Sequence, residues 1–275
     1  MESFRRQFRD VGKPVIVTDA LSGWAALERW TPASLAERFP DRVVKFKYGG
    51  LEMPLREFIP QVLASSAEKP APYLTNLPLA ATFPELLPEI SPLPDLCGAN
   101  WAERGLLHPA LRRDLKRGAL LELYIGGPGG AFPIVHWDGL STHVLLMQVH
   151  GIKQYWVWPP EDAPFLYATE PRNVSAISNV ETPDLQRFPR LAKARTTTFT
   201  LHPGELLFVP SRWWHTARML TPSITVSQNL LNHSNWANFT DDLTHQSRGL
   251  AGFAKRTYLK AEYARHRVLD LLRAG

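Results

Sequence analysis

The feature that most constrains the fold is a run of short apolar segments that begins near residue 120. Six segments rich in β-branched and aromatic residues follow one another, separated by glycine, proline or polar turns: LLELYIG, HVLLMQV, QYWVW, TTFTL, ELLFVP and SITVSQNLL. Strands of this length at this spacing are typical of a β-sandwich or a β-barrel. We therefore expect a mainly β core over residues 119–232.

The residues that flank this core predict helices and a few short strands. Before it, PVIVTD and RVVKFKY predict strands, and helices are expected at TPASLAERF, with Thr31 as N-cap, and at PLREFIPQVLAS. Seven prolines within residues 70–94 predict an extended connector without regular elements. We expect residues 1–118 to form an α/β segment that packs on the barrel, and residues 233–275 to form a helical region.

The C-terminal helical region carries an apolar stripe. Its members are Phe253, Leu259, Val268, Leu271 and Leu272. Such a stripe is buried either against the core of its own chain or against a second copy, so the region is a candidate element for homodimerisation. Residues 255–273 also carry four of the five net positive charges of the chain. We interpret this basicity as a solvated helix face and expect no nucleic-acid partner.

Composition excludes several classes of protein. Hydrophobic residues make up 44% and charged residues 21% of the chain, which fits an ordinary globular protein. The first residues lack the apolar segment of a signal peptide, and no apolar run approaches the roughly 18 residues of a membrane span, so we expect a cytoplasmic protein without a membrane partner. Cys97 is the only cysteine, so a metal would need histidine and carboxylate ligands.

Ligand-type side chains stand one residue apart at His136 and Asp138, in GGAFPIVHWDG. Residues i and i+2 of a strand point to the same side, so both can face one cavity. A third candidate, His215, follows a strand and a short turn in HPGELLFVPSRWWH, and pairing of the two segments would bring all three together. Two histidines and one carboxylate suit a non-haem Fe(II) site better than a zinc site. Taken singly, Asp138 also fits the cap of a turn, and His136 and His215 each fit a histidine packed in the core.

Together these motifs resemble the JmjC branch of the cupin superfamily, the Fe(II)- and 2-oxoglutarate-dependent hydroxylases and demethylases, and in particular its small hydroxylases. The resemblance extends from Lys13 to Asn232 and is carried by KPVIVTDALSGW, by the H-x-D motif, by GIKQYWVWPP and by GELLFVPSRWWH. It implies a double-stranded β-helix, or jelly-roll, core of the cupin type, with the α/β segment before it and the helical tail after it.

The resemblance also implies roles for individual residues. His136, Asp138 and His215 match the iron ligands of the family. Lys153, in HGIKQYW, matches the lysine that pairs with the distal carboxylate of 2-oxoglutarate. That role is physically sensible, because a carboxylate buried in a barrel needs a cationic partner.

Further cosubstrate contacts are implied by weaker matches. Tyr73, in PYLTN, resembles a tyrosine that binds the same carboxylate, and Asn229 stands where the family often has an asparagine in the cosubstrate pocket. Many relatives carry Thr or Ser three residues before the first histidine, whereas this chain has Pro133. We therefore expect Thr142 or His143 to help complete the pocket, although His143 also fits a packed position.

The implied activity is that of an Fe(II)- and 2-oxoglutarate-dependent oxygenase. With O2 as co-reactant, it would hydroxylate a C–H bond of a protein or peptide side chain and release succinate and CO2. Demethylation of N-methyl-lysine, hydroxylation of a small molecule or natural product, and non-catalytic binding by the barrel are the alternatives. Substrate choice usually depends on loops, and the loop sequences of this chain contain no motif that identifies a substrate.

Overall fold

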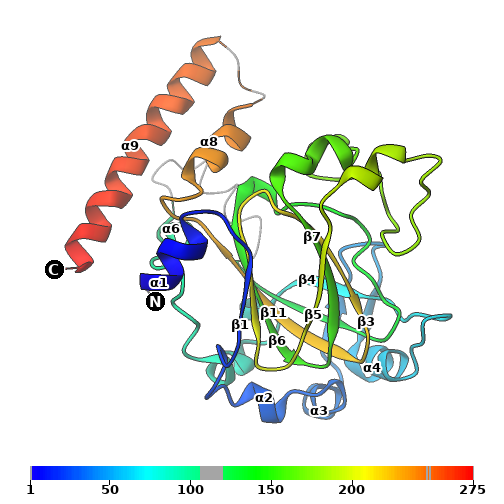
Figure 1. Cartoon of the computed structure of the whole chain (residues 1–275). Helices are drawn as coiled ribbons and strands as arrows, with labels where there is room; N and C mark the ends of the chain where they lie inside the picture. The colour runs from blue at the N-terminus through cyan, green and yellow to red at the C-terminus, as the bar shows by residue number, and fades with distance from the viewer. Residues whose placement is uncertain (1, 106–119, 246, 248, 275) are drawn as a thin grey trace.

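The structure is a computed structural model of the 275-residue chain, and it describes residues 2–105, 120–245, 247 and 249–274. A twisted barrel forms the body of the molecule, short helices cover one end of it, and a long helix projects to one side (Figure 1). The expected boundary between residues 118 and 119 lies outside the described residues.

Two antiparallel sheets build the barrel. The large sheet has the strand order β1-β9-β6-β11-β5-β4, and the small sheet has the order β10-β7-β8. Their bounds are β1 Val15–Val17, β4 Leu74–Pro78, β5 Leu121–Gly126, β6 His143–His150, β7 Lys153–Trp158, β8 Thr197–Leu201, β9 Leu206–Val209, β10 Trp214–Met219 and β11 Ser223–Leu230. A separate hairpin pairs β2 (Val43–Lys45) with β3 (Glu52–Pro54). This architecture confirms the expected mainly β fold with a jelly-roll core.

The large sheet is buried on both faces. Its outer face, with Leu123, Leu145 and Phe208, belongs to one apolar cluster with helix residues such as Leu35 and Phe58. Its inner face packs against the small sheet in a second cluster, where side chains of β6 and β9 meet those of β7, β8 and β10. Burial on both faces explains why β6 is a nearly continuous apolar run instead of an alternating one.

Helices precede the barrel strands, follow the last of them, and also occur in connections between them. The bounds are α1 Glu2–Phe4, η1 Arg5–Arg9, α2 Ala26–Arg29, α3 Pro32–Arg38, α4 Leu55–Leu63, α5 Leu79–Thr82, η2 Pro84–Ile90, α6 Trp101–Arg104, η3 Gly139–Ser141, η4 Pro160–Phe165, η5 Pro189–Lys193, α8 Trp236–Thr244 and α9 Gly249–Ala274. Thr31 caps α3, as expected, by accepting a hydrogen bond from the Ser34 backbone N–H. None of the described helices combines the length and the apolar character needed to cross a membrane.

The expectation of a connector without regular elements at residues 70–94 is wrong. This stretch supplies β4, which pairs with β5 at the edge of the large sheet, and then α5 and η2. The prolines are compatible with these elements because of where they stand: Pro78 ends an edge strand, and Pro84 begins η2. Their positions, more than their number, decide the local structure.

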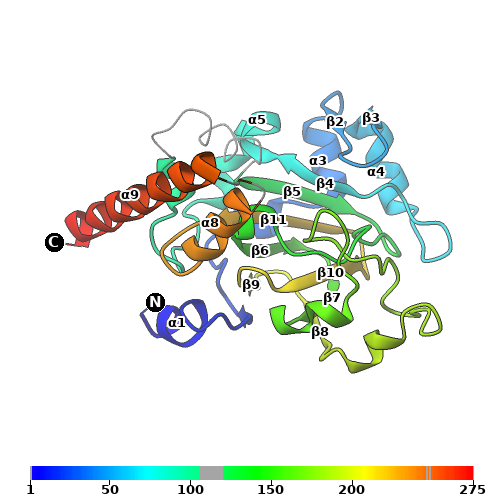
Figure 2. The ribbon, with the colours of Figure 1, turned by 90° about the horizontal axis from the view of Figure 1, so that it is seen from above.

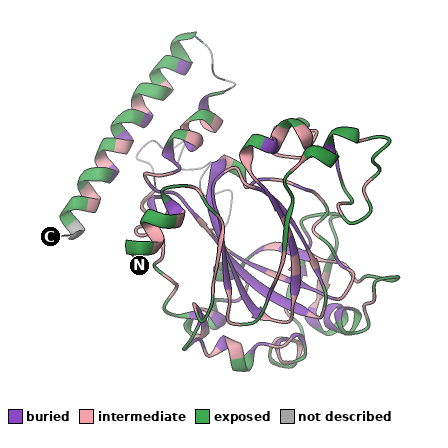
Figure 3. Ribbon diagram, viewed as in Figure 1, coloured by how far each residue is buried: buried purple, intermediate pink, exposed green. Residues whose placement is uncertain are grey.

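The apolar stripe of the C-terminal region is not core packing, except at one residue. Leu259 is fully buried, in a cluster with Trp101, Trp236 and Phe239. The other four members, Phe253, Val268, Leu271 and Leu272, are exposed by 54% to 73% of their surface. Most of α9 is exposed (Figure 3), and the helix projects beyond the barrel when the molecule is seen from above (Figure 2).

Candidate metal centre

His136 and His215 are brought together by backbone pairing. The His136 N–H donates to the His215 carbonyl over 3.1 Å, and the His215 N–H donates to the His136 carbonyl over 2.7 Å. His215 is the second residue of β10, a strand that was not expected from the sequence. His136 lies in an irregular segment and forms only isolated bridges, so the expected continuous strand at His136–Asp138 is wrong, although the pairing of the two segments is present.

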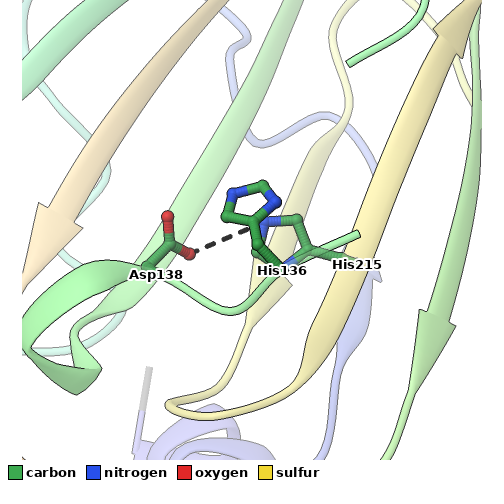
Figure 4. Close-up of side chains that lie close together, drawn as sticks. All are labelled: His136, Asp138 and His215. Carbon is green, nitrogen blue, oxygen red and sulfur yellow. Dashed lines mark ion pairs between the residues drawn. The ribbon is translucent and has the colours of Figure 1, made fainter. Parts of the chain in front are cut away.

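The three candidate side chains converge on one point. One ligand atom from each of His136, Asp138 and His215 lies within 4.8 Å of the others (Figure 4). His215 Nε2 lies 3.7 Å from Asp138 Oδ2. His215 Nδ1 donates to the Trp213 carbonyl over 3.1 Å. This bond fixes the tautomer and leaves the Nε2 lone pair directed toward Asp138.

His136 is held in the form that binds metals. Its ring stacks on Phe132 with centroids 4.5 Å apart and an interplanar angle of 17°. Burial, followed by the proximity of His215, holds the His136 pKa well below its usual value, so the imidazole is neutral at physiological pH. Among the described residues, none forms a hydrogen bond with its buried Nδ1. A neutral imidazole with a free Nδ1, beside a carboxylate and a second imidazole, fits a divalent transition metal.

Asp138 completes the donor set. Burial raises the pKa of its carboxyl, and His215 and Lys47 act in the opposite direction. Asp138 stands at the start of η3, and the Ser141 N–H donates to its carbonyl over 3.1 Å. Two imidazoles and one carboxylate on one side of a metal leave the other side open, which is the arrangement of non-haem Fe(II) oxygenases.

A cavity between the two sheets joins this cluster to Lys153. Its lining consists of Tyr73, Tyr124, Phe132, His136, Asp138, Val144, Leu146, Lys153, Tyr155, His215, Thr216, Ala217 and Thr225. Both sheets contribute, because Lys153 and Tyr155 come from β7 whereas Tyr124 comes from β5. The three ligand-type residues therefore share one cavity with the expected carboxylate-binding pair, Lys153 and Tyr73.

Lys153 is a buried amine, and the described residues place no carboxylate in an ion pair with it. Its side chain is 1% exposed, and its Nζ donates to the Tyr73 hydroxyl over 3.0 Å. No carboxylate of the described residues lies within ion-pair distance of Nζ. Burial lowers the Lys153 pKa from 10.5 to about 7. A buried ammonium group of this kind is suited to an anionic ligand, which would supply the missing charge.

Of the weaker sequence candidates, Tyr73 lines the cavity, whereas Thr142, Asn229, His143 and Pro133 lie outside its lining. The Thr142 hydroxyl donates to Asn229 Oδ1 over 3.1 Å, so these two residues contact each other. Pro133 is exposed. His143 is packed: its Nδ1 accepts from the Ser211 N–H over 2.9 Å, and its Nε2 contacts the Ser234 hydroxyl at the same distance.

Sequence reasoning missed a polar cluster next to the cavity. The Tyr124 hydroxyl donates to Glu122 Oε2 over 2.8 Å, and Asn76 Nδ2 donates to that same oxygen over 2.8 Å. Asn76 Oδ1 accepts from Lys47 Nζ over 3.2 Å. Burial raises the pKa of the Glu122 carboxyl. The signal was present in LELYIG, where Glu122 and Tyr124 alternate with apolar residues and so share one face of the strand.

The comparisons with known proteins agree with this geometry. Residues 1–234 match the family described as Cupin-like domain. HSPB1-associated protein 1 of Bos taurus is 42% identical over 130 residues, which is 46% of this chain and 25% of that protein. Jumonji C domain-containing protein 5 of Drosophila melanogaster is 25% identical over 242 residues, 82% of this chain and 57% of that protein.

A third relative extends the same pattern. Lysine-specific demethylase 8 of Xenopus tropicalis is 27% identical over 243 residues, 82% of this chain and 50% of that protein. The chain thus spans between 25% and 57% of the length of these three relatives. Since the family match covers most of the chain and the relatives include Jumonji C proteins, the chain belongs to the cupin-like family as a member of its JmjC branch.

Proposed function

We propose that this protein is an Fe(II)- and 2-oxoglutarate-dependent oxygenase that hydroxylates a side chain of a protein or peptide. The observation that carries the proposal is one cavity that contains both His136, Asp138 and His215 and the buried Lys153–Tyr73 pair. A metal-binding triad and a buried cation in the same cavity suit a chelating dicarboxylate better than either feature alone would.

Each residue has a defined task in this proposal. His136, Asp138 and His215 would hold Fe(II), and the Lys153 ammonium with the Tyr73 hydroxyl would bind the distal carboxylate of the cosubstrate. When bound, Fe(II) and 2-oxoglutarate supply the oxidising chemistry that uses O2. The chain then has to chelate, orient and exclude water. An apolar cluster that includes Val135, Trp137 and Trp214 borders the ligand segments and supports the exclusion of water.

A protein substrate is favoured over a small molecule by the relatives. The name of the bovine relative describes association with another protein, and the name of the frog relative describes action on lysine. These names favour a polypeptide side chain as the group that reaches the metal. Hydroxylation is the reaction proposed for it.

The test is succinate formation. The purified chain, with Fe(II) and 2-oxoglutarate, is incubated with a peptide panel, and succinate is measured with and without peptide. We expect His136→Ala and Asp138→Ala to abolish Fe-dependent succinate formation. His202→Ala is the matched control, because His202 is an exposed histidine that contacts Thr200 and lies outside the cavity.

The products separate the alternatives. A mass increase of one oxygen on a peptide supports hydroxylation, whereas formaldehyde released from a methylated peptide would assign demethylation instead. Binding of Fe(II) and 2-oxoglutarate without turnover of any substrate would favour a binding barrel. Unchanged turnover in the His136 and Asp138 variants would reject the site.

A further inference from the structure

Two aspartates of α8 connect the chain segments that surround the candidate metal centre. Asp242 Oδ2 accepts a hydrogen bond from the Ser141 hydroxyl over 2.6 Å, and Asp242 Oδ1 accepts from Arg212 Nη2 over 3.1 Å and from Arg172 Nη2. Asp241 Oδ2 accepts from Arg212 Nη2 over 2.5 Å and from Arg172 Nη2 over 3.0 Å. We refer to Ser141, Arg172, Arg212, Asp241 and Asp242 as the α8 clamp.

Each partner of these aspartates is close in sequence to a metal-site residue. Ser141 lies in η3, three residues after Asp138. Arg212 lies three residues before His215, and its Nε also donates to the Ser141 hydroxyl over 3.0 Å.

The third partner, Arg172, is connected to the metal site through the next residue, Asn173. Arg172 precedes Asn173, whose Nδ2 donates to the Trp137 carbonyl over 2.8 Å and whose carbonyl accepts from the Trp137 N–H over 3.1 Å. Trp137 stands between His136 and Asp138 in the chain. The α8 clamp therefore ties together the backbone on both sides of the donor set.

The backbone at the α8 clamp is strained. Leu140, Ser141 and Arg212 have φ values of 58°, 50° and 65°, in the left-handed region that side chains other than glycine rarely adopt. Such conformations persist only where surrounding contacts impose them. The contacts present here include the hydrogen bonds and ion pairs of the α8 clamp, together with a hydrogen bond from Asn235 Nδ2 to the Ser141 carbonyl over 3.1 Å.

The α8 clamp is partly withdrawn from water: Arg172 and Asp241 are 37% and 51% exposed, and the other three members are less exposed. The side chain of Asp242 is 9% exposed and that of Arg212 is 27% exposed, and Ser141 is fully buried. Removing the Asp242 carboxylate would leave Arg172 and Arg212 paired with Asp241 alone, and would leave the buried Ser141 hydroxyl without its acceptor. The family match ends at residue 234, before α8 begins at Trp236, so Asp241 and Asp242 lie outside the region that defines the family.

We propose that Asp242 is a positioning residue of the metal centre. Through Ser141 and Arg212 it holds the segments that carry Asp138 and His215 at the separation a metal requires. The inference rests on the proposed metal site and goes beyond it, because it assigns to a helix outside the family region the task of shaping that site. Substitutions in the α8 clamp should therefore weaken metal binding without contact to the metal.

The experiment measures metal affinity of the full chain without cosubstrate. Co(II), a spectroscopic substitute for Fe(II), is titrated into the wild type, Asp242→Asn and Arg212→Gly, with thermal unfolding of the metal-free proteins recorded in parallel. We expect both variants to bind Co(II) about tenfold more weakly, the lower end of the effect of substitutions behind metal ligands. Arg212→Lys, which keeps the charge without the bridging geometry of the guanidinium, should fall between them and the wild type.

Arg212→Gly tests whether the Arg212 guanidinium or the left-handed backbone at residue 212 sets the geometry of the metal site. Glycine relieves the positive φ and removes the guanidinium, so an unchanged affinity in this variant would show that backbone geometry alone sets the site. The matched control is Asp270→Asn, which removes a carboxylate of α9 that binds Arg104 over 2.6 Å and is absent from the cavity lining. We expect it to leave Co(II) affinity unchanged.

The outcomes distinguish this inference from the proposed function. If the wild type binds no Co(II), the metal site itself fails. If the wild type binds and the folded Asp242→Asn and Arg212→Gly proteins bind equally well, the positioning role is wrong. An equal loss of affinity in Asp270→Asn would assign the effect to general destabilisation. If Asp242→Asn does not fold, the Co(II) affinity of Arg212→Gly decides whether the positioning role is correct.

Discussion

Lys153 is the residue at which burial and charge are in greatest conflict. Its ammonium group lies between two sheets, next to the rings of Tyr73 and Tyr124 at 5.2 and 5.7 Å, and its pKa is lowered to about 7. The aromatic faces and the Tyr73 hydroxyl stabilise the cation only in part. A lysine kept in this state costs stability, and the proposed anionic cosubstrate would account for that cost.

Cosubstrate binding should depend on the protonation of Lys153. Below pH 7 the ammonium form is present before binding, whereas above pH 7 a proton must be taken up with the carboxylate. We therefore expect the Kd for 2-oxoglutarate, measured with metal present, to rise about tenfold per pH unit between pH 7.5 and 9. Isothermal titration in two buffers of different ionisation enthalpy measures this proton uptake. A flat pH profile that Lys153→Met reproduces would contradict the role of Lys153.

The same residue should destabilise the ligand-free protein in a pH-dependent way. The folded-state pKa is lowered, so the unfolded chain binds more protons between pH 7 and 10.5 and stability rises with pH across that window. Below pH 7 the full penalty applies. Lys153→Met should therefore raise the melting temperature at pH 6 by several degrees, roughly 2–4 °C per kcal/mol. The gain should disappear near pH 10.5, and a gain independent of pH would indicate a packing effect instead.

At the scale of single elements, the turn between β6 and β7 is the most sensitive to substitution. Gly151 has φ +72°, and an added Cβ would meet the Pro222 carbonyl oxygen at 2.0 Å. Gly151→Ala should destabilise the fold by about 3 kcal/mol, because it adds a steric clash to backbone strain. Gly204→Ala is the matched control: φ is +89° and no atom lies within 4 Å, so about 1 kcal/mol is expected. Urea unfolding measures both, and equal effects would exclude the clash.

The packing of helix α9 on the rest of the protein should depend mainly on one residue of its predicted apolar stripe, Leu259. Leu259→Ala opens a cavity next to Trp101 and Phe239 and should cost about 2–5 kcal/mol. Leu271→Ala, at a position 69% exposed, should change stability by less than about 0.5 kcal/mol. Chemical unfolding at low protein concentration measures this contrast. A large, concentration-dependent effect of Leu271→Ala would instead support the predicted dimer.

The elements that could be predicted from the sequence are those with a local signal. The Thr31 cap and the apolar runs of the barrel strands have such signals, and so have His136 and Asp138 within their motif. β4 could not be predicted, because Pro78 within it and Pro70 and Pro72 before it obscure an edge strand that forms by pairing with β5. The strand that carries His215 could not be predicted either. It contains the polar residues Thr216 and Arg218, which weaken the apolar pattern that marks the other strands.

At the scale of the whole molecule, the cavity couples the stability of the barrel to its ligands. Lys153 comes from the small sheet and Tyr124 from the large sheet, so a ligand bound between them bridges both. Metal and 2-oxoglutarate, each at about 100 times its Kd, should together raise the free energy of unfolding by about 5 kcal/mol. Differential scanning fluorimetry measures the shift. His136→Ala should abolish the contribution of the metal, and Lys153→Met only that of 2-oxoglutarate.

The strand order of the large sheet has a consequence for biosynthesis. β11, the final strand of the barrel, lies between β6 and β5, and β5 and β6 do not pair with each other in that sheet. A chain growing on the ribosome can pair β5 with β4 and later β6 with β9, but β5 and β6 join one sheet only after residues 223–230 have emerged. His215 precedes that strand by only a few residues. The nascent chain should thus lack the complete candidate metal centre until the strands of both sheets have been synthesised.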